Sequence, residues 1–288
     1  MTLTPSQYKG YYRKVDVPLA NGGSSTVDVH KYRLATAPPT ADFRRNEAAM
    51  NAFLDKLKGG VKIDLRVNLV PVKDDTPTGV QPVAASVLSG LTVMARYVFG
   101  GKGAPEHCQI VLQLADHWGL APDGLQAYAD SALGLDCNGF VGNYLWHARL
   151  GKPWNEMGLD KHDGPDQTID DYFDTRSKKL VSKWEDINSA NIYILGEANE
   201  TTGKIIPGGG SDTGHITITE PGQFRAAMPP FPSGIWVVES TASAPDPGLL
   251  ESWYSLDTAA GALKVFKLTR ESITNARRKV FFKIAQVT

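Results

Sequence analysis

The chain has 288 residues, of which 42% are hydrophobic and 21% are charged. These proportions are typical of globular proteins and exclude a largely disordered chain. Its 30 basic and 31 acidic residues give a formal net charge of −1, so no overall charge draws it to nucleic acid or anionic lipid. Two cysteines, Cys108 and Cys137, are too few for a disulfide framework or a cysteine-based zinc site.

The N-terminal stretch lacks the pattern of a secretory signal, because residues 1–17 hold no apolar run. The most apolar stretch, residues 87–99, is interrupted by Ser89, Thr92 and Arg96, so the sequence predicts no membrane span. We therefore expect synthesis in the cytoplasm without a signal peptide.

The first part of the chain begins with turns and continues with helical patterns. Two β-type runs flank Asn21-Gly22-Gly23 and predict a hairpin. Apolar residues at helical spacing predict helices over residues 45–58, 87–98 and 108–118, whereas strict alternation predicts a strand over residues 61–72.

The pattern changes after Trp184 to short β-type runs that Gly and Pro separate. These runs cover residues 192–195, 215–219, 235–239, 263–268 and 280–284. Helices followed by an antiparallel sheet predict an α+β fold. The glycine-rich loop of residues 199–214 precedes the second run, and long loops beside a sheet often carry function.

The two cysteines differ in context. Cys108 lies on the apolar stripe of a predicted helix, so we expect it to be a small buried core residue. Cys137 follows Gly134-Leu135-Asp136, and helical spacing begins directly after it. A thiol at a helix N-terminus faces unpaired N–H groups, which predicts a lowered thiol pKa and a reactive cysteine. On spacing alone, Cys137 could equally be the first core residue of that helix.

A cysteine nucleophile needs a base, and the chain has six histidines: His30, His107, His117, His147, His162 and His215. His147 lies ten residues after Cys137 on the same predicted helix, roughly 15 Å along its axis. His215 opens a strand directly after the glycine-rich loop, where an imidazole can project into a cleft. It is the favoured candidate, although a lone histidine at such a place is commonly ordinary surface.

The segment Gly134-Leu135-Asp136-Cys137-Asn138-Gly139-Phe140-Val141 resembles the G-x-D-C-S-G-F-V segment of NlpC-type papain-like cysteine peptidases. Gly214-His215-Ile216 resembles that family's histidine strand, and residues 234–240 resemble the strand whose late polar residue orients the histidine. The resemblance spans residues 120–245 and makes Cys137 the nucleophile and His215 its base. Asn138 departs from the family's serine, and the 78 residues from Cys137 to His215 exceed the family's usual spacing.

The resemblance points to Glu239 as the third catalytic residue, where the family usually has His, Asn or Gln. A carboxylate can accept a hydrogen bond from the imidazole, although a solvent-facing strand glutamate is the alternative. Two candidate supporting residues precede the cysteine. Asp136 is the aspartate of the G-x-D-C segment, and Tyr128 is a candidate for the aromatic residue that the family places before the cysteine.

The resemblance implies a papain-like core of N-terminal helices packed on an antiparallel sheet, over residues 101–288. Residues 1–100 would form an α/β extension of unknown role that packs on this core. The implied function is hydrolysis of an amide bond in peptidoglycan stem peptides through a thioacyl enzyme, without metal or other cofactor.

Such an enzyme would be an antibacterial or lytic protein, exported by a non-standard route and met by a secretion-system or inhibitory immunity partner. The alternative is a non-hydrolytic relative, either an acyl or peptidyl transferase or a cell-wall-binding module.

Other chemistries have little support in the sequence. It contains no Gly-x-Ser-x-Gly elbow, no phosphate loop and no His-Glu-x-x-His. One acidic cluster could hold a cation, but its spacing matches no known cation loop, and a solvated segment is the favoured interpretation: Asp160, Asp163, Asp166, Asp170, Asp171 and Asp174.

Overall fold

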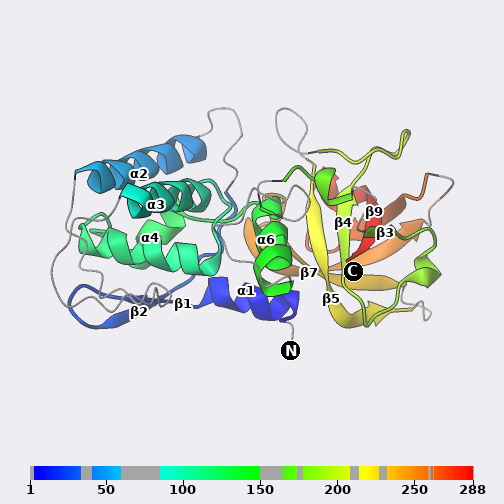
Figure 1. Cartoon of the computed structure of the whole chain (residues 1–288). Coiled ribbons are helices and arrows are strands. Elements are labelled where there is room, and N and C mark those ends of the chain that lie inside the picture. The colour runs from blue at the N-terminus through cyan, green and yellow to red at the C-terminus, as the bar shows by residue number, and fades with distance from the viewer. Residues whose placement is uncertain are drawn as a thin grey trace.

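The computed structural model describes residues 3–33, 41–59, 85–149, 164–165, 167–173, 178–207, 214–226, 232–258, 261 and 263–287. The chain is an α+β protein, as predicted. Most helices and the N-terminal hairpin lie at one end of the molecule and the strands after residue 177 at the other, with α1 (Pro5–Arg13) and α6 (Cys137–Asn143) between them (Figure 1). The predicted strand over residues 61–72 lies outside the described residues.

The N-terminal residues form α1 (Pro5–Arg13) and a hairpin of β1 (Val15–Pro18) and β2 (Ser24–Val27). The hairpin confirms the prediction from Asn21-Gly22-Gly23, and Gly22 adopts a φ of +88° in its turn. Helix α1 was not predicted. Its N-terminus is stabilised by reciprocal hydrogen bonds between Thr4 and Gln7, and its buried face is formed mainly by tyrosines rather than aliphatic residues.

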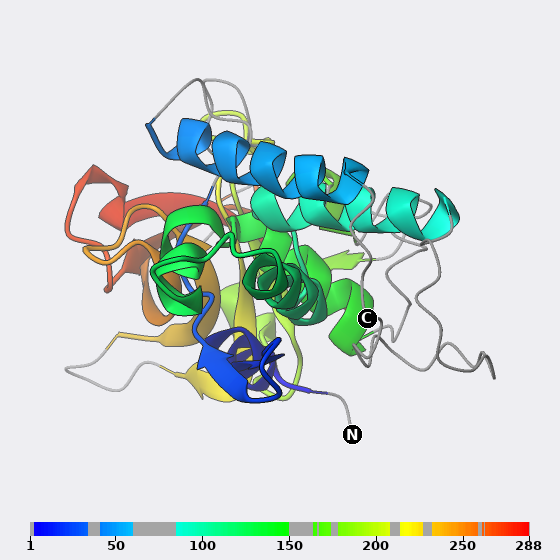
Figure 2. The ribbon, with the colours of Figure 1, turned by 90° about the vertical axis from the view of Figure 1, so that its left-hand side faces the viewer.

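The α-helices that follow in the described part of the chain are α2 (Ala41–Lys58), α3 (Ala85–Phe99), α4 (Pro105–His117), α5 (Leu125–Ala132) and α6 (Cys137–Asn143). The residues directly after α6 continue as a π-helical turn, η1 (Tyr144–Arg149). The three helices predicted within residues 45–58, 87–98 and 108–118 are confirmed. Turning the molecule by 90° shows α2 and α3 running side by side along one edge (Figure 2).

The strands are β3 (Lys178–Leu180), β4 (Tyr193–Glu197), β5 (Ile216–Arg225), β6 (Gly234–Thr241), β7 (Gly248–Thr258), β8 (Phe266–Arg270) and β9 (Lys279–Val287). All pair antiparallel in the order β3-β9-β4-β5-β6-β7-β8. Because β8 also pairs with β9, the strands from β4 to β9 close into a six-stranded barrel. The five predicted strands are confirmed, whereas β3 and β7 were missed.

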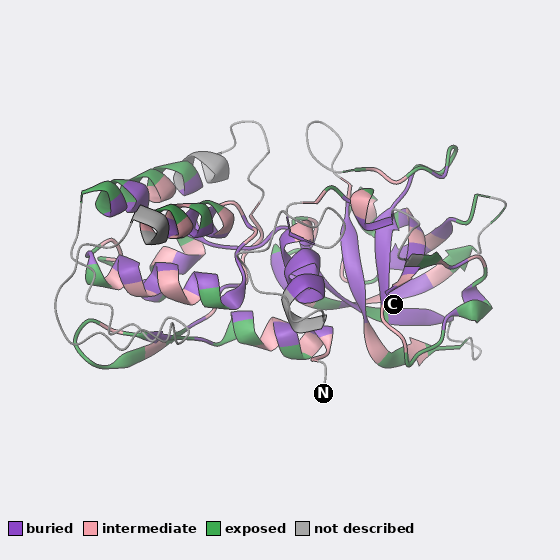
Figure 3. Cartoon of the chain, viewed as in Figure 1, coloured by how far each residue is buried: buried purple, intermediate pink, exposed green. Residues whose placement is uncertain are grey.

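Alternation along the barrel strands separates two hydrophobic clusters. One lies inside the barrel and includes Val237, Tyr254 and Phe282. The other joins the outer face of β5 and β6 to the helices, through residues such as Ile218 and Val238. Helix α6 packs on this outer face, and both faces of these central strands are buried (Figure 3).

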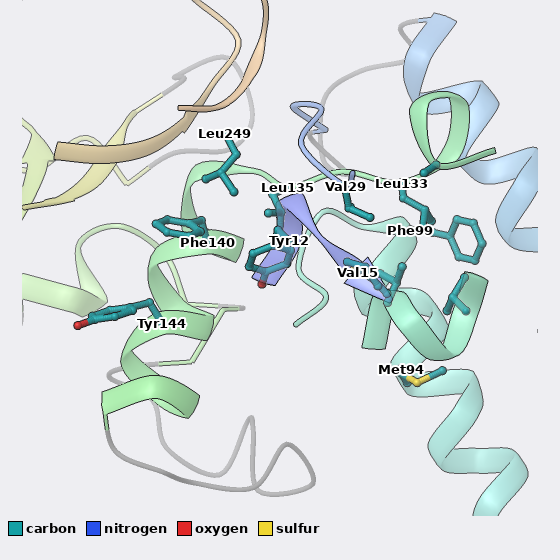
Figure 4. Packing of buried hydrophobic residues seen from close by; sticks show 14 of the residues in the cluster. Tyr12, Val15, Val29, Met94, Phe99, Leu133, Leu135, Phe140, Tyr144 and Leu249 are labelled. Carbon is teal, nitrogen blue, oxygen red and sulfur yellow. The ribbon is translucent and has the colours of Figure 1, made fainter. Parts of the chain in front are cut away.

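Residues before position 101 pack closely against the rest of the chain. The rings of Tyr12 and Phe140 lie 6.2 Å apart, and Leu135 and Tyr144 belong to the same buried cluster (Figure 4). The Tyr12 hydroxyl also donates to the backbone carbonyl of Gly103 at 2.9 Å. The N-terminal part therefore shares a core with α6. None of the described helices has the length and apolar character needed to cross a membrane.

Candidate active site

Cys137 is the first residue of α6, as the sequence predicts. The Asp136 carboxylate caps this helix by accepting from the Gly139 backbone N–H at 2.6 Å. Gly139 is constrained by a close backbone approach, because a Cβ there would lie 1.9 Å from the Gly101 carbonyl oxygen. The glycine two positions after the cysteine is thus required by packing.

The Cys137 sulfur lies against the beginning of β5. The backbone N–H groups of Ile216 and Asn138 point at it, and the thiol lies 3.5 Å from Asn138 Oδ1. Asn138 is itself anchored, since its side-chain amide donates to the Gln167 carbonyl at 2.7 Å. Ile216 begins β5 and directly follows His215 in the chain, so the fold brings the nucleophile candidate to the backbone next to the predicted base.

The expected low thiol pKa is wrong for this site. Cys137 is only 6% exposed, and burial, followed by the charge of Asp136, raises its pKa to about 11. The two backbone N–H groups and the charge of Lys102 act in the opposite direction but are outweighed. Lys102 is paired with Asp136 at 2.7 Å. The thiol is therefore protonated in the resting protein at neutral pH.

His215 and Glu239 lie together at one end of the barrel interior. His215 Nε2 is 2.6 Å from Glu239 Oε2, and both side chains are buried. Glu239 therefore does not face solvent, and the alternative interpretation of a solvent-facing strand glutamate is wrong. Alternation along β6 places it with Val237 inside the barrel and Trp236 outside.

Two residues that the sequence did not single out hold the same carboxylate oxygen. Arg270 Nη2 donates to Glu239 Oε2 at 2.7 Å, and the Tyr254 hydroxyl donates to it at 2.8 Å. Both side chains are fully buried in the barrel. A signal for Arg270 exists in the sequence, because it alternates with Phe266 and Leu268 on the inward face of β8. Tyr254 had no such signal, since its strand was missed.

Burial alone would raise the pKa of Glu239, but the Arg270 charge and the His215 hydrogen bond hold it at about 2. Burial and the Arg270 charge also lower the pKa of His215, against the opposing pull of Glu239. The resting site therefore combines an ionised Glu239 with a neutral imidazole. An ionised carboxylate only accepts hydrogen bonds, so Nε2 carries the imidazole hydrogen and Nδ1 is the basic nitrogen.

Tyr32 is a further residue near the thiol. Its backbone bridges to Leu135 just before α6, and burial, then the neighbouring Cys137 and Asp136, raise the pKa of its phenol. The predicted supporting residue Tyr128 lies instead on α5, and its buried hydroxyl has no hydrogen-bond partner among the described residues. Tyr32 is 105 positions from Cys137, and no local pattern marks it.

The remaining candidate residues either have a structural role or lie outside the part of the chain that the structure describes. Cys108 is fully buried in the helical core, as predicted. His107 Nδ1 accepts from the Ala104 backbone N–H at 3.2 Å at the start of α4. The side chains of His147 and His162, and much of the acidic cluster, lie outside the described residues. Within the described ranges, no three His, Cys, Asp or Glu side chains gather as metal ligands would.

Comparisons of the chain with protein-family models, curated proteins and solved structures return no match. The class that the fold and the site define is therefore a general one: an α+β protein with a six-stranded antiparallel barrel, whose helix α6 carries a buried cysteine beside a buried His–Glu pair.

Proposed function

We propose that this protein is a cysteine amidase of the NlpC-type papain-like class, with Cys137 as nucleophile, His215 as general base and Glu239 as the residue that orients the imidazole. The observation that carries this proposal is the contact of the Cys137 sulfur with the backbone of Ile216, next to a His215 that is bound to Glu239 at 2.6 Å. A nucleophile, a base and an orienting carboxylate on three elements form the arrangement that acyl transfer requires.

The mechanism starts from a neutral thiol and a neutral imidazole. His215 Nδ1 takes the thiol proton as the Cys137 sulfur attacks the amide carbonyl carbon, and the carbonyl electron pair moves to its oxygen. The tetrahedral adduct then collapses, the C–N bond breaks, and the leaving amine takes the proton from His215. Water, deprotonated by His215, attacks the thioester in the second half, and the released thiolate regains its proton. The balance is one amide and one water converted to an acid and an amine.

The substrate class follows from the resemblance of residues 134–141 and 214–216 to NlpC-type enzymes. We propose that the amide lies in a peptidoglycan stem peptide, that an exported antibacterial or lytic role follows, and that an immunity protein binds the site. Tyr32 lies close enough to Cys137 for the cysteine to raise the pKa of its phenol, so we propose that residues 1–100 take part in the site.

The test is digestion of purified peptidoglycan by wild-type protein, Cys137→Ala and Cys108→Ala, with the products identified by mass spectrometry. We expect wild type and Cys108→Ala to release the same fragment and Cys137→Ala to release none. Digestion in H₂¹⁸O separates hydrolysis from transfer, because only hydrolysis puts ¹⁸O into the new carboxyl group. Absence of any Cys137-dependent product would overturn the proposal.

A further inference from the structure

Arg270 is the most deeply buried cation that the structure describes in the barrel. It lies on β8 with its side chain 1% exposed, and its guanidinium makes three hydrogen bonds. Nη2 donates to Glu239 Oε2 at 2.7 Å and to Thr241 Oγ1 at 3.1 Å, and Nε donates to the Tyr254 hydroxyl at 2.8 Å. A planar guanidinium held at several points has a fixed orientation, which a lysine ammonium would not have.

Glu239 is the acceptor of every hydrogen bond that the structure describes around its carboxylate. Arg270, Tyr254 and His215 all approach the same carboxylate oxygen, Oε2. The other oxygen, Oε1, is buried and accepts no hydrogen bond from the described residues. The Tyr254 hydroxyl accepts from Arg270 and donates its own hydrogen to Glu239. The three donors on Oε2 and the ion pair with Arg270 favour an ionised Glu239, and an ionised Glu239 requires the hydrogen of His215 to be on Nε2.

We propose that Arg270 is a positioning residue that fixes the tautomer of His215, by keeping Glu239 ionised so that the Nδ1 lone pair stays available to Cys137. Arg270 contacts neither the thiol nor a reacting atom in this arrangement, and it acts through Glu239. The inference rests on the proposed function for its catalytic meaning. The protonation state that it assigns can nevertheless be measured without any substrate.

Other charges face His215 and contribute to its titration. Arg277, on the turn η5 (Ala276–Arg278), adds a second positive charge that disfavours imidazolium, and it is paired with Glu197. Glu239 and Arg270 act from inside the barrel, and Cys137 lies on the α6 side. Removing the Arg270 charge leaves a buried carboxylate with only a neutral imidazole and a phenol, so the Glu239–His215 pair should take up one proton.

The experiment is ¹⁵N and ¹³C NMR titration of histidine-labelled wild-type protein, Arg270→Met, Arg270→Lys and the matched control Arg278→Met. Arg278 is half-exposed and pairs with Glu271, away from the barrel interior. We expect wild type, Arg270→Lys and Arg278→Met to hold a neutral His215 with its hydrogen on Nε2 at pH 7. In Arg270→Met the midpoint of proton uptake by the pair should rise by about 1–3 pH units.

His30 and His107 provide internal references for the fold in each variant. An unchanged midpoint in a folded Arg270→Met would overturn the proposal. If that variant does not fold, the wild-type spectrum still decides, because imidazolium at pH 7 or a hydrogen on Nδ1 would contradict the assignment. A correct tautomer in a protein that cuts no peptidoglycan would leave the positioning role intact and remove only the proposed function.

Discussion

The two sides of the candidate site each contain an ion pair of the same length. On the helix side Lys102 binds Asp136 at 2.7 Å, and on the barrel side Arg270 binds Glu239 at 2.7 Å. The first pair is partly open, with the lysine side chain 21% exposed, whereas the arginine is 1% exposed. The equal distances hide a large difference in environment.

The environments give the two carboxylates different tasks. Asp136 divides its oxygens between the helix cap and Lys102, and its charge still raises the pKa of the adjacent thiol. Among the described residues, Glu239 accepts its hydrogen bonds on one oxygen, Oε2, and it is held ionised inside the barrel. The partly exposed pair of Lys102 and Asp136, on the open side of the site, thus stabilises the start of α6. The fully buried pair of Arg270 and Glu239, the closed pair, sets the protonation of the neighbouring imidazole.

The largest effect should come from breaking the closed pair. Arg270→Met leaves Glu239 buried without its cation, and we expect a loss of about 3–5 kcal/mol in the free energy of unfolding. Urea denaturation measures it. The control Arg278→Met, at an exposed position, should change the value by no more than about 0.5 kcal/mol. Equal losses in the two variants would show that burial of the pair has no special weight.

Acid should weaken the closed pair next. The pKa of Glu239 is held at about 2, below the value of about 4.3 of an unfolded chain. Its contribution is therefore complete above about pH 4.5 and is lost as the pH falls toward 2, by up to about 3 kcal/mol. Denaturation across this range in wild type and Glu239→Gln measures the contribution. A wild-type slope no steeper than that of the variant would contradict it.

A change in packing at the start of α6 should lower the free energy of unfolding by a smaller amount. In Gly139→Ala the new Cβ meets the Gly101 carbonyl, so α6 must shift and we expect a loss of about 1–3 kcal/mol. Gly10→Ala is the matched control, because no described atom beyond its chain neighbours and the backbone of α1 lies within 4 Å of its Cβ position. There the better helix propensity of alanine should add about 0.5–1 kcal/mol. A neutral Gly139→Ala would mean that the two backbones lie further apart.

The smallest effect should come from removing the negative charge of Asp136, next to the Cys137 thiol. Asp136→Asn keeps a capping residue but removes the carboxylate that raises the pKa of Cys137. The pKa should fall, and the rate of iodoacetamide labelling at pH 8 should rise by about tenfold for each pKa unit. Labelling is read at Cys137 by peptide mapping, with the buried Cys108 as reference. A slower rate would show that Asp136 does not oppose thiolate formation.

The sequence predicted those parts of the site that depend on local pattern. Helical spacing after Cys137 predicts the start of α6, and the β-type run over residues 235–239 predicts β6, which carries Glu239. The predicted low pKa of the Cys137 thiol is wrong, because burial outweighs the N–H groups at the helix terminus. Alternation along β8 marks Arg270 as an inward-facing residue, but its contact with Glu239 depends on barrel closure, and Tyr32 comes near Cys137 through a long-range backbone bridge. Single-sequence periodicity encodes neither of these long-range contacts.

In the proposed mechanism Cys137 carries the acyl group while His215 moves the proton. Rapid acid quenching of the protein with peptidoglycan fragments, followed by intact-mass spectrometry and peptide mapping, tests it directly. We expect a transient adduct with the mass of the acyl fragment on Cys137, absent in Cys137→Ala and strongly reduced in His215→Ala. Peptide cleavage that persists in Cys137→Ala, or an adduct formed equally well without His215, would contradict it.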